Sequence, residues 1–481
     1  MTGVTRATRG RGTTVGAGVR AARPRRLVAV AAALVAAAVA AGPAASASPA
    51  LLAAPAVPPV PATVLPATTG ALTGPAPVDT ALVAQVRAAL GTRALGPDVA
   101  ADVIDVATGT RIVGLAPTRP QKPASTLKLL TAVTVLRALG DDARLSTRVV
   151  QGATPRDVVL VGGGDATLTR APAPSPVAGQ AARPASLSAL VAATVKALHA
   201  SGRGSVTVHV DDSLFTGPRT AAGWPSGYVS SGVIGPVSAL SVDQGQRSAS
   251  SRSRDADPAL AAGDAFVAGL RAAGITVLGA VTRVRAASGA QQLAEVQSPT
   301  VAQLVERMLT ESDDTLAEAL AHLAGGALGG AASFAGGAAA TTATLTSLGV
   351  PVAGVHLEDG SGLSLQDVVP PATLVRTLAA IAADAPPAGA TAGVLWPASS
   401  GLPVAGATGT LALRFGASGT TQGRGVVRAK TGTLTGVDCL AGLVRDPHGR
   451  LLAFAYLADR TVGPQLDSRT ALDRAAAALA G

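Results

Sequence analysis

The fold is decided by residues 426–457, VVRAKTGTLTGVDCLAGLVRDPHGRLLAFAYL, in which apolar runs are interrupted by turn residues. This pattern predicts three consecutive β-strands, over 426–437, 440–444 and 451–457. The sequence Asp446-Pro447-His448-Gly449 is typical of a turn between the last two strands. A closing helix is expected over 468–479.

The front of the folded chain carries a matching set of elements. Residues 99–115 predict two apolar strands around a turn, and helices are expected over 79–90 and 125–139. The second helix is apolar on most faces and is therefore expected to be buried. Elements of this kind at both ends favour one antiparallel sheet flanked by helices and built from both ends of the chain, an α+β fold.

The middle of the chain, residues 146–295, is interpreted as a large inserted domain, because the sheet has to close around it. The part that forms this sheet then consists of residues 79–145 and 296–481. The insertion contains strand-like segments at 157–161, 205–210 and 275–284 and helix-like segments at 187–199 and 258–273.

The N-terminal segment has the composition of an export signal. Residues 1–47 hold seven arginines and no acidic residue, and an apolar run is followed by the cleavage-site pattern Ala45-Ser46-Ala47. Residues 48–78 are rich in Ala and Pro, which predicts a semi-rigid linker. We therefore expect an exported protein in a cell wall or periplasm-like space, without a firm membrane span after signal cleavage.

The composition also excludes several classes of partner. Without the signal segment the chain has 32 basic and 29 acidic residues, and aromatic residues make up only 2%, so no nucleic-acid partner is expected. One cysteine, Cys439, rules out a disulfide framework and is expected to be a small buried side chain. The five histidines lack metal-ligand spacing, so neither a metal nor another cofactor is expected.

Lysine is rare in this chain, which has 35 arginines but only four lysines: Lys122, Lys128, Lys196 and Lys430. A desolvated lysine can lose its proton, whereas arginine effectively cannot, so each lysine is a candidate functional residue. Lys128 follows Ser125 by three residues at the start of a predicted helix, which places hydroxyl and amine on one face. Such a pair is a candidate nucleophile and base.

Two further motifs contain polar groups suited to substrate binding. Lys430-Thr431-Gly432 lies in a predicted strand, where it offers a cation, a hydroxyl and room for a substrate backbone. Ser312-Asp313-Asp314 opens a helical stretch, and taken alone it is most simply a helix N-cap with favourable acidic residues.

Together, Ser125-Thr126-Leu127-Lys128, Ser312-Asp313-Asp314 and Lys430-Thr431-Gly432 resemble, in order, the three motifs of the penicillin-binding protein and serine β-lactamase superfamily. The long separation between the first two motifs is similar to that in class C low-molecular-mass penicillin-binding proteins, the D-alanyl-D-alanine carboxypeptidase/endopeptidases. Other stretches also resemble this family: 160–165, 235–240, 242–245 and 359–364.

The resemblance implies a serine peptidase that acts on peptidoglycan stem peptides and is inhibited covalently by β-lactams. Ser125 would attack the D-Ala-D-Ala carbonyl, Lys128 would accept its proton, and Ser312 would relay a proton to the leaving amine. The implied substrate-binding residues are Asp314, Lys430, Thr431, Gly432 and Thr433. Backbone N–H groups of Ser125 and Thr433 would form the oxyanion hole.

Asp314 departs from this pattern, because the family's second motif usually ends in Asn and the chain contains no asparagine. A carboxylate only accepts hydrogen bonds, whereas an amide also donates them. We expect Asp314 to pair with Lys128 and to favour its protonated form, which would weaken this lysine as a base.

Two alternative functions stay open. One is a β-lactamase or serine esterase on the same scaffold, for which Tyr228-Val229-Ser230 faintly resembles a Tyr-x-Asn second motif, although it lies inside the predicted insertion. The other is a non-catalytic peptidoglycan-binding homologue, supported directly only by Asp314.

Asp359–Ser364 is also consistent with a plain surface turn and is not counted among the site residues.

Overall fold

The computed structural model describes residues 79–172, 183–248, 251–384 and 393–481. The predicted signal segment 1–47 and linker 48–78 lie outside the described residues. Within the described ranges, none of the helices has the length and apolar character needed to cross a membrane.

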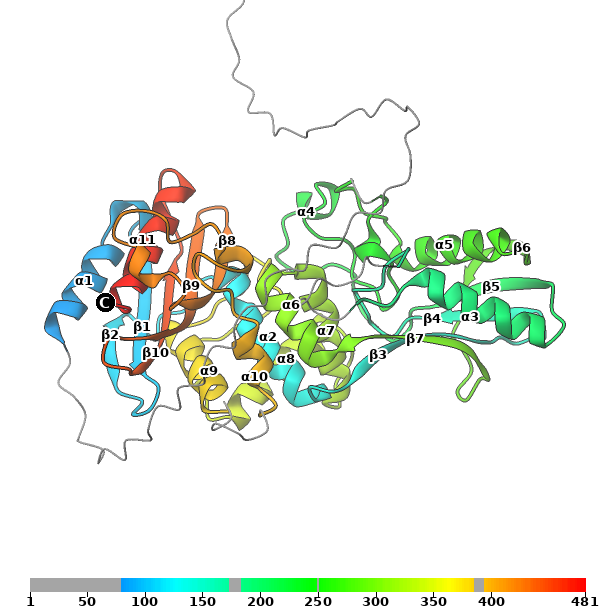
Figure 1. The fold of residues 1–481 in the computed structure, drawn as a ribbon, viewed down its shortest axis with the longest axis horizontal. Coiled ribbons are helices and arrows are strands. Elements are labelled where there is room, and N and C mark those ends of the chain that lie inside the picture. The colour runs from blue at the N-terminus through cyan, green and yellow to red at the C-terminus, as the bar shows by residue number, and fades with distance from the viewer. Residues whose placement is uncertain (1–78, 173–182, 249–250, 385–392) are drawn as a thin grey trace, which may run out of the picture. The chain divides into compact units, whose positions relative to one another are not determined.

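The predicted antiparallel sheet is present, and both ends of the chain build it (Figure 1). Its strand order is β2-β1-β10-β9-β8, and all neighbouring strands run antiparallel. The strands are β1 (Val99–Asp105), β2 (Arg111–Leu115), β8 (Arg428–Leu434), β9 (Val437–Arg445) and β10 (Leu451–Ala458). β8 forms the edge of the sheet, and the outer side of its first residue, Arg428, pairs only with Val404 in an isolated bridge.

The strand predicted over 426–437 is wrong at both ends. It begins at Arg428 and stops at Leu434, and Val437 already belongs to the next strand. Thr435-Gly436 forms a two-residue hairpin turn in which Gly436 has φ 74°. Such turns match the twist of the flanking strands, and glycine adopts the positive φ without a steric penalty.

The two faces of the sheet contribute to separate cores, because side chains alternate along each strand. On β10, Leu452, Phe454 and Tyr456 enter one core, and the intervening residues enter the other. Helices α1 (Thr80–Leu90) and α11 (Gln465–Ala478) cover the first face, and α9 (Pro371–Ala383) packs on the second (Figure 1). These helices confirm the predictions for 79–90 and 468–479 to within three residues.

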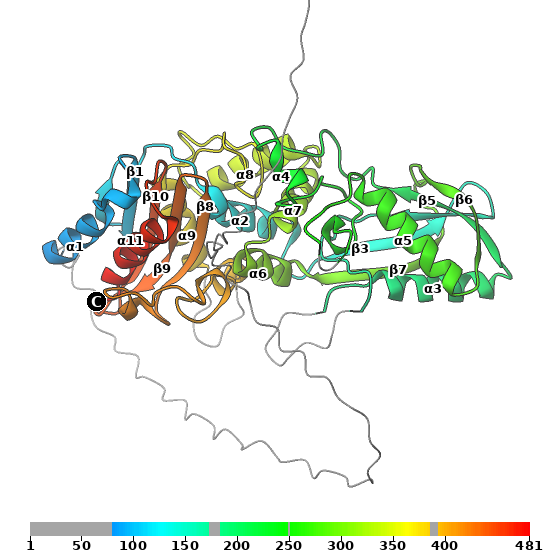
Figure 2. The same ribbon diagram turned by 90° about the horizontal axis from the view of Figure 1, so that it is seen from above.

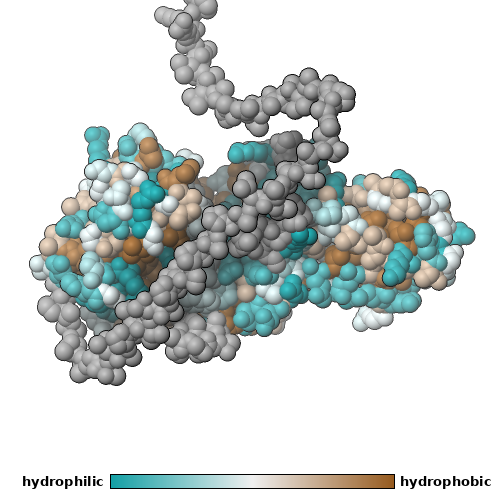
Figure 3. All heavy atoms as spheres, in the orientation of Figure 1, coloured by the Kyte–Doolittle hydropathy of each residue, from teal (hydrophilic) through white to brown (hydrophobic). Residues whose placement is uncertain are grey.

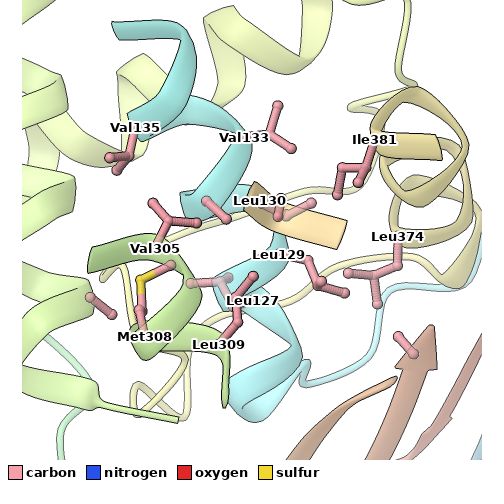
Figure 4. Close-up of a cluster of buried hydrophobic side chains, with 14 of the residues drawn as sticks. Leu127, Leu129, Leu130, Val133, Val135, Val305, Met308, Leu309, Leu374 and Ile381 are labelled. Carbon is pink, nitrogen blue, oxygen red and sulfur yellow. The ribbon is translucent and has the colours of Figure 1, made fainter. Parts of the chain in front are cut away.

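Helix α2 (Lys128–Leu139) is the centre of the second core, and all of its residues from Lys128 to Leu136 are buried. Figure 4 shows its apolar side chains between those of α6 (Val301–Glu311) and α9. Each buried Leu or Val contributes roughly 1.5–3 kcal/mol, so the start of α2 is held firmly. The predicted helix 125–139 is therefore confirmed, with a 3-10 turn at Ala124–Leu127 as its first part.

A second, mixed sheet of order β6-β5-β4-β3-β7 occupies the middle of the chain (Figure 2). Its elements are β3 (Arg144–Gln151), β4 (Asp157–Val161), α3 (Leu187–Ala200), β5 (Ser205–Asp211), α5 (Pro258–Ala272), β6 (Thr276–Arg283) and β7 (Gln292–Thr300). Because β3 and β7 pair antiparallel, the chain enters the middle segment through β3 and leaves it through β7 at neighbouring positions. The predicted domain bounds, 146–295, remain a prediction.

The remaining helices are α4 (Gly227–Ser230), α7 (Asp314–Ala327), α8 (Phe334–Ser347) and α10 (Trp396–Ser400). Where grey atoms do not cover the face drawn in Figure 3, hydrophobic and hydrophilic residues are interspersed. Scattered apolar residues of this kind are normal on a surface that faces water.

Candidate active site

The turn before α2 presents Ser125 next to Lys128. Lys128 Nζ lies 2.9 Å from Ser125 Oγ, and the lysine side chain is fully buried. Ala124, immediately before the serine, has φ 44°, a left-handed conformation that is costly for a residue other than glycine. The predicted pair of hydroxyl and amine is therefore assembled, on backbone that carries local strain.

Lys128 Nζ has two further acceptors. It donates to Asp314 Oδ1 at 2.6 Å and to the backbone carbonyl of Ser361 at 2.8 Å. With Ser125 Oγ these acceptors match the three hydrogens of an ammonium group. The contact expected between Asp314 and Lys128 is present.

Ser312 and Lys430 form a second pair of hydroxyl and amine. Ser312 ends α6 with φ 58°, and the next residue, Asp313, caps α7 through the N–H of Leu316. Lys430 Nζ lies 2.8 Å from Ser312 Oγ. Burial, and secondarily the charge of Lys128, lowers the pKa of Lys430 well below its ordinary value. Asp313 is therefore the N-cap of α7, as the sequence indicated for this motif, whereas the side chain of Ser312 contacts Lys430.

The residues after Lys430 differ in their surroundings. Thr431 Oγ1 donates to Thr410 Oγ1 at 2.9 Å, and Thr433 Oγ1 donates to Asp438 Oδ1 at 3.1 Å. A Cβ at Gly432 would lie 2.7 Å from the carbonyl oxygen of Pro123, so glycine is required for the packing of the turn that carries the serine. The predicted contact of Gly432 with substrate remains a prediction.

These groups line a cavity of about 360 Å³, bounded by Ser125, Ser312, Thr410, Arg414, Thr431, Thr433 and Arg469. The sequence analysis missed the two arginines. Arg414 is compensated by a bidentate ion pair with Asp473 at 2.7 and 3.2 Å. Arg469 is partly exposed, and its Nε lies 3.6 Å from Asp438 Oδ1, so its guanidinium is less fully engaged.

The Asp359–Ser364 stretch is not a surface turn. Asp359, Ser361 and Ser364 are buried, and the carbonyl of Ser361 contacts Lys128 directly. The sequence signal for this stretch was its similarity to the family, since a turn-rich composition alone does not distinguish buried from exposed turns.

Within the described residues, no three His, Cys, Asp or Glu side chains gather as they would around a metal ion. Cys439 is buried as expected, its Sγ contacts the carbonyl of Lys122 at 3.3 Å, and burial raises the pKa of its thiol.

A serine whose adjacent base is a buried lysine, beside the edge strand of an antiparallel sheet flanked by helices, is characteristic of serine hydrolases that work through an acyl-enzyme. The chain belongs to the D-Ala-D-Ala carboxypeptidase 3 (S13) family, whose model matches residues 82–256 and 247–479.

Curated relatives agree with this assignment, and a solved structure shares the fold. The chain is 37% identical to a carboxypeptidase of Mycobacterium tuberculosis, over 82% of this chain and 84% of the relative. It is 35% identical to carboxypeptidase DacB of Mycolicibacterium smegmatis, over 88% of both chains. Penicillin binding protein 4 (DacB) from Haemophilus influenzae shares the fold, with a TM-score of 0.66 and 22% identity over 82% of this chain and 97% of that chain.

Proposed function

We propose that this member of the carboxypeptidase family removes terminal D-Ala from peptidoglycan stem peptides through an acyl-enzyme on Ser125, and that penicillins acylate the same serine. The observation that carries the proposal is the 2.9 Å contact between Ser125 Oγ and buried Lys128 Nζ at the wall of a 360 Å³ cavity. A cavity of this size admits the end of a peptide.

The geometry supports the following sequence of steps. Neutral Lys128 takes the hydroxyl proton as Ser125 Oγ bonds to the carbonyl carbon of the penultimate D-Ala. The N–H groups of Ser125 and Thr433 stabilise the oxyanion, a contribution of about 3 kcal/mol per donor. Ser312, which is hydrogen-bonded to Lys430, relays a proton to the leaving amine as the C–N bond breaks. Water then hydrolyses the ester and releases the shortened peptide.

Arg469 is proposed to bind the terminal carboxylate together with Lys430, Thr431 and Thr433. Its Nη2 lies 3.4 Å from Thr433 Oγ1, at the wall of the same cavity. A guanidinium is suited to a carboxylate because its planar donors form paired hydrogen bonds. Asp314 remains a proposed substrate-binding residue as well, although it accepts and does not donate.

A β-lactamase or esterase that used Tyr228 as its base is less well supported. Burial, and secondarily the charge of Asp314, raises the pKa of Tyr228, so its phenol keeps its proton at neutral pH. A protonated phenol cannot take the proton of a serine hydroxyl. Lys128, by contrast, lies within hydrogen-bond distance of Ser125.

We also propose that the protein is exported and works in the cell wall or a periplasm-like space. The support is the arginine-rich, then apolar segment 1–47 with its A-x-A pattern, followed by the Ala- and Pro-rich segment 48–78. A substrate in the wall requires this location. Cleavage of peptide cross-links is a second activity for which the same site is suited, because a cross-link also ends at a D-Ala carbonyl.

The test is labelling by a fluorescent penicillin, followed by mass spectrometry of the adduct and by assay of D-Ala release from a peptide ending in D-Ala-D-Ala. We expect one adduct on Ser125, none in Ser125→Ala, and unchanged labelling in the control Ser188→Ala, which alters an exposed serine of α3. Equal labelling of the protein and Ser125→Ala would refute the assignment of the nucleophile.

A further inference from the structure

The turn at Asp359–Ser364 touches α2 at two points one helical turn apart. The carbonyl of Ser361 accepts from Lys128 Nζ at 2.8 Å, and the carbonyl of Gly360 accepts from Thr131 Oγ1 at 2.6 Å. Both carbonyls therefore contact the same face of α2, one at Lys128, the proposed base, and the other one helical turn later at Thr131.

Glu318 holds this turn from the other side. Its Oε1 accepts from the N–H of Ser361 at 2.9 Å, and its Oε2 accepts from the N–H of Gly360 at 3.0 Å. Glu318 is fully buried on α7, four residues after Asp314, so both carboxylates project from the same face of the helix. One carboxyl group thus fixes the two peptide units whose carbonyls contact α2.

The turn fits closely against its neighbours. A Cβ at Gly360 would lie 2.5 Å from Ala321 Cβ, and Gly362 has φ 83° with its Cβ position 1.9 Å from the carbonyl oxygen of Ala124. Glycine at both positions lets the turn lie directly against α7 and against the residue before the nucleophile. The carbonyl of Ser361 therefore has little freedom to move away from Lys128.

The number of acceptors determines where the lone pair of the base points. A neutral lysine amine has two N–H groups and one lone pair. When Asp314 and the Ser361 carbonyl each take one N–H, the lone pair is left facing Ser125. We propose that Glu318 is a positioning residue, which fixes the carbonyl of Ser361 so that the lone pair of neutral Lys128 points at the nucleophile.

This inference rests on the proposed function of Lys128 as the base. Burial, and secondarily the charge of Asp359, raises the pKa of Glu318 well above its ordinary value, while the hydrogen bonds from Ser361 and Gly360 and the charge of Lys128 oppose this shift. Because each of its oxygens accepts from a backbone N–H, the ionised carboxylate is the form that holds the turn.

Other charged groups surround the base as well. Asp314 and Glu318 face Lys128 from α7, and Lys430 faces it from β8. Helices α8 and α10 carry no charged residue. The charged side chains of α6 and α9 interact with other groups. Glu306 accepts a hydrogen bond from Ser400, Arg307 forms ion pairs with Glu311 and Asp313, and Arg376 donates to the carbonyl of Gly109.

The test compares acylation by a fluorescent penicillin between pH 5 and pH 9 in the full chain and three variants. Glu318→Gln presents an amide NH₂ to one of the two backbone donors, and we expect the maximal second-order rate constant to fall about 10- to 100-fold. The fall should appear in the rate constant of the protein that becomes labelled, and not only in the labelled fraction, because the lone pair of the base no longer points at Ser125. Thr131→Val, which is nearly isosteric and leaves Glu318 in place, should lower the rate about 3- to 10-fold.

Glu306→Gln is the matched control, since Glu306 is a glutamate of the neighbouring α6 that accepts from Ser400 Oγ at 2.5 Å, outside the active site. It should acylate as the unaltered protein does. A purely structural role of Glu318 would reduce the fraction of protein that becomes labelled but leave the rate constant of the labelled fraction unchanged, and that outcome overturns the proposal. If Glu318→Gln does not fold, an unchanged profile in Thr131→Val also overturns it. Absence of labelling in the unaltered protein would instead refute the proposed function, and with it this inference.

Discussion

Asp314 is the residue of the site whose charge bears most directly on the base, since its Oδ1 lies 2.6 Å from Lys128 Nζ. The Asp314→Asn substitution removes this charge but keeps an acceptor oxygen for the lysine. We expect the second-order rate constant of acylation at pH 7 to rise at least about tenfold, because an amide can also donate a hydrogen bond to the substrate carbonyl, which a carboxylate cannot. Stopped-flow labelling with a fluorescent penicillin at pH 7 measures this rate constant.

The control for this prediction is Asp313→Asn, which removes a neighbouring carboxylate that contacts Gln244 and Arg307 and caps α7. Asparagine is as good an N-cap as aspartate, so the helix start is retained. An equal rise of the acylation rate constant in both variants would mean that net charge, and not the contact with Lys128, controls the rate.

Arg469 gives a prediction about substrate selection. Arg469→Gln should lower kcat/KM for a peptide with a free D-Ala carboxylate about 10- to 100-fold, because hydrogen bonds to a charged group are lost. The same peptide with an amidated C-terminus should be cleaved no worse than by the unaltered enzyme. Arg474→Gln, which changes an exposed arginine on the same helix, should leave both substrates unaffected. An equal loss on both substrates would exclude carboxylate binding by Arg469.

At the residue scale, the sequence predicted the lysines of the site but not its arginines. Lys128 and Lys430 stand out because the chain has only four lysines, and both are fully buried next to serines. Arg469 is one of 35 arginines, so neither composition nor spacing distinguishes it from surface residues. Its place at the cavity wall is visible only once α11 packs on the sheet.

Among the elements, α7 contains a titratable group that couples stability to pH. Burial lowers the pKa of His322 from 6.5 to about 4, and its ring packs against Phe215 and Phe334 with centroids 4.9 and 4.6 Å away. Because the folded pKa lies below the unfolded value, the stability it contributes is present above pH 6.5 and is lost as pH falls toward 4. Between pH 7 and pH 5 this loss amounts to about 2 kcal/mol.

His322→Gln removes this titration, so its free energy of unfolding should fall less than that of the unaltered protein over the same pH interval. The two-point difference from urea denaturation at pH 7 and pH 5 is the readout, because a constant cost of the substitution cancels. His448→Gln, which changes an exposed histidine in a turn, is the control and should behave as the unaltered protein does. A pH dependence that His322→Gln retains in full would contradict a buried neutral imidazole.

The elements that the sequence predicted are those whose pattern is local. The apolar run of β10 and the buried helix α2 were found because period and burial agree with one another. Strands β3 and β7 were missed, since RLSTRVVQ and QLAEVQSPT contain many polar residues and form strands through their mutual pairing. The boundary at Thr435-Gly436 was missed because Gly436 lies inside an otherwise strand-like run.

At the scale of the whole molecule, the site joins segments that are distant in the chain. Ser125 lies before α2, Ser312 lies between α6 and α7, and Lys430 lies on β8. The sheet brings the two chain ends together, and the middle segment adds two contacts. Gln244 Nε2 donates to Asp313 Oδ2 at 2.6 Å, and Trp224 Nε1 donates to Asp359 Oδ2 at 2.7 Å. We infer that the inserted segment supports the catalytic residues as well as extending the molecule.

The chain has two tryptophans, so the second of these contacts is open to fluorescence measurement. Trp224 donates a hydrogen bond to Asp359, which lies in the turn that contacts Lys128. Trp396, by contrast, is exposed on α10. Acylation should therefore change the emission of Trp396→Phe, in which Trp224 remains, and leave that of Trp224→Phe nearly constant. Trp224→Phe should also acylate about 3- to 10-fold more slowly, the effect of one lost hydrogen bond. An equal emission change in both variants, with unaltered rates, would show that the inserted segment does not sense the site.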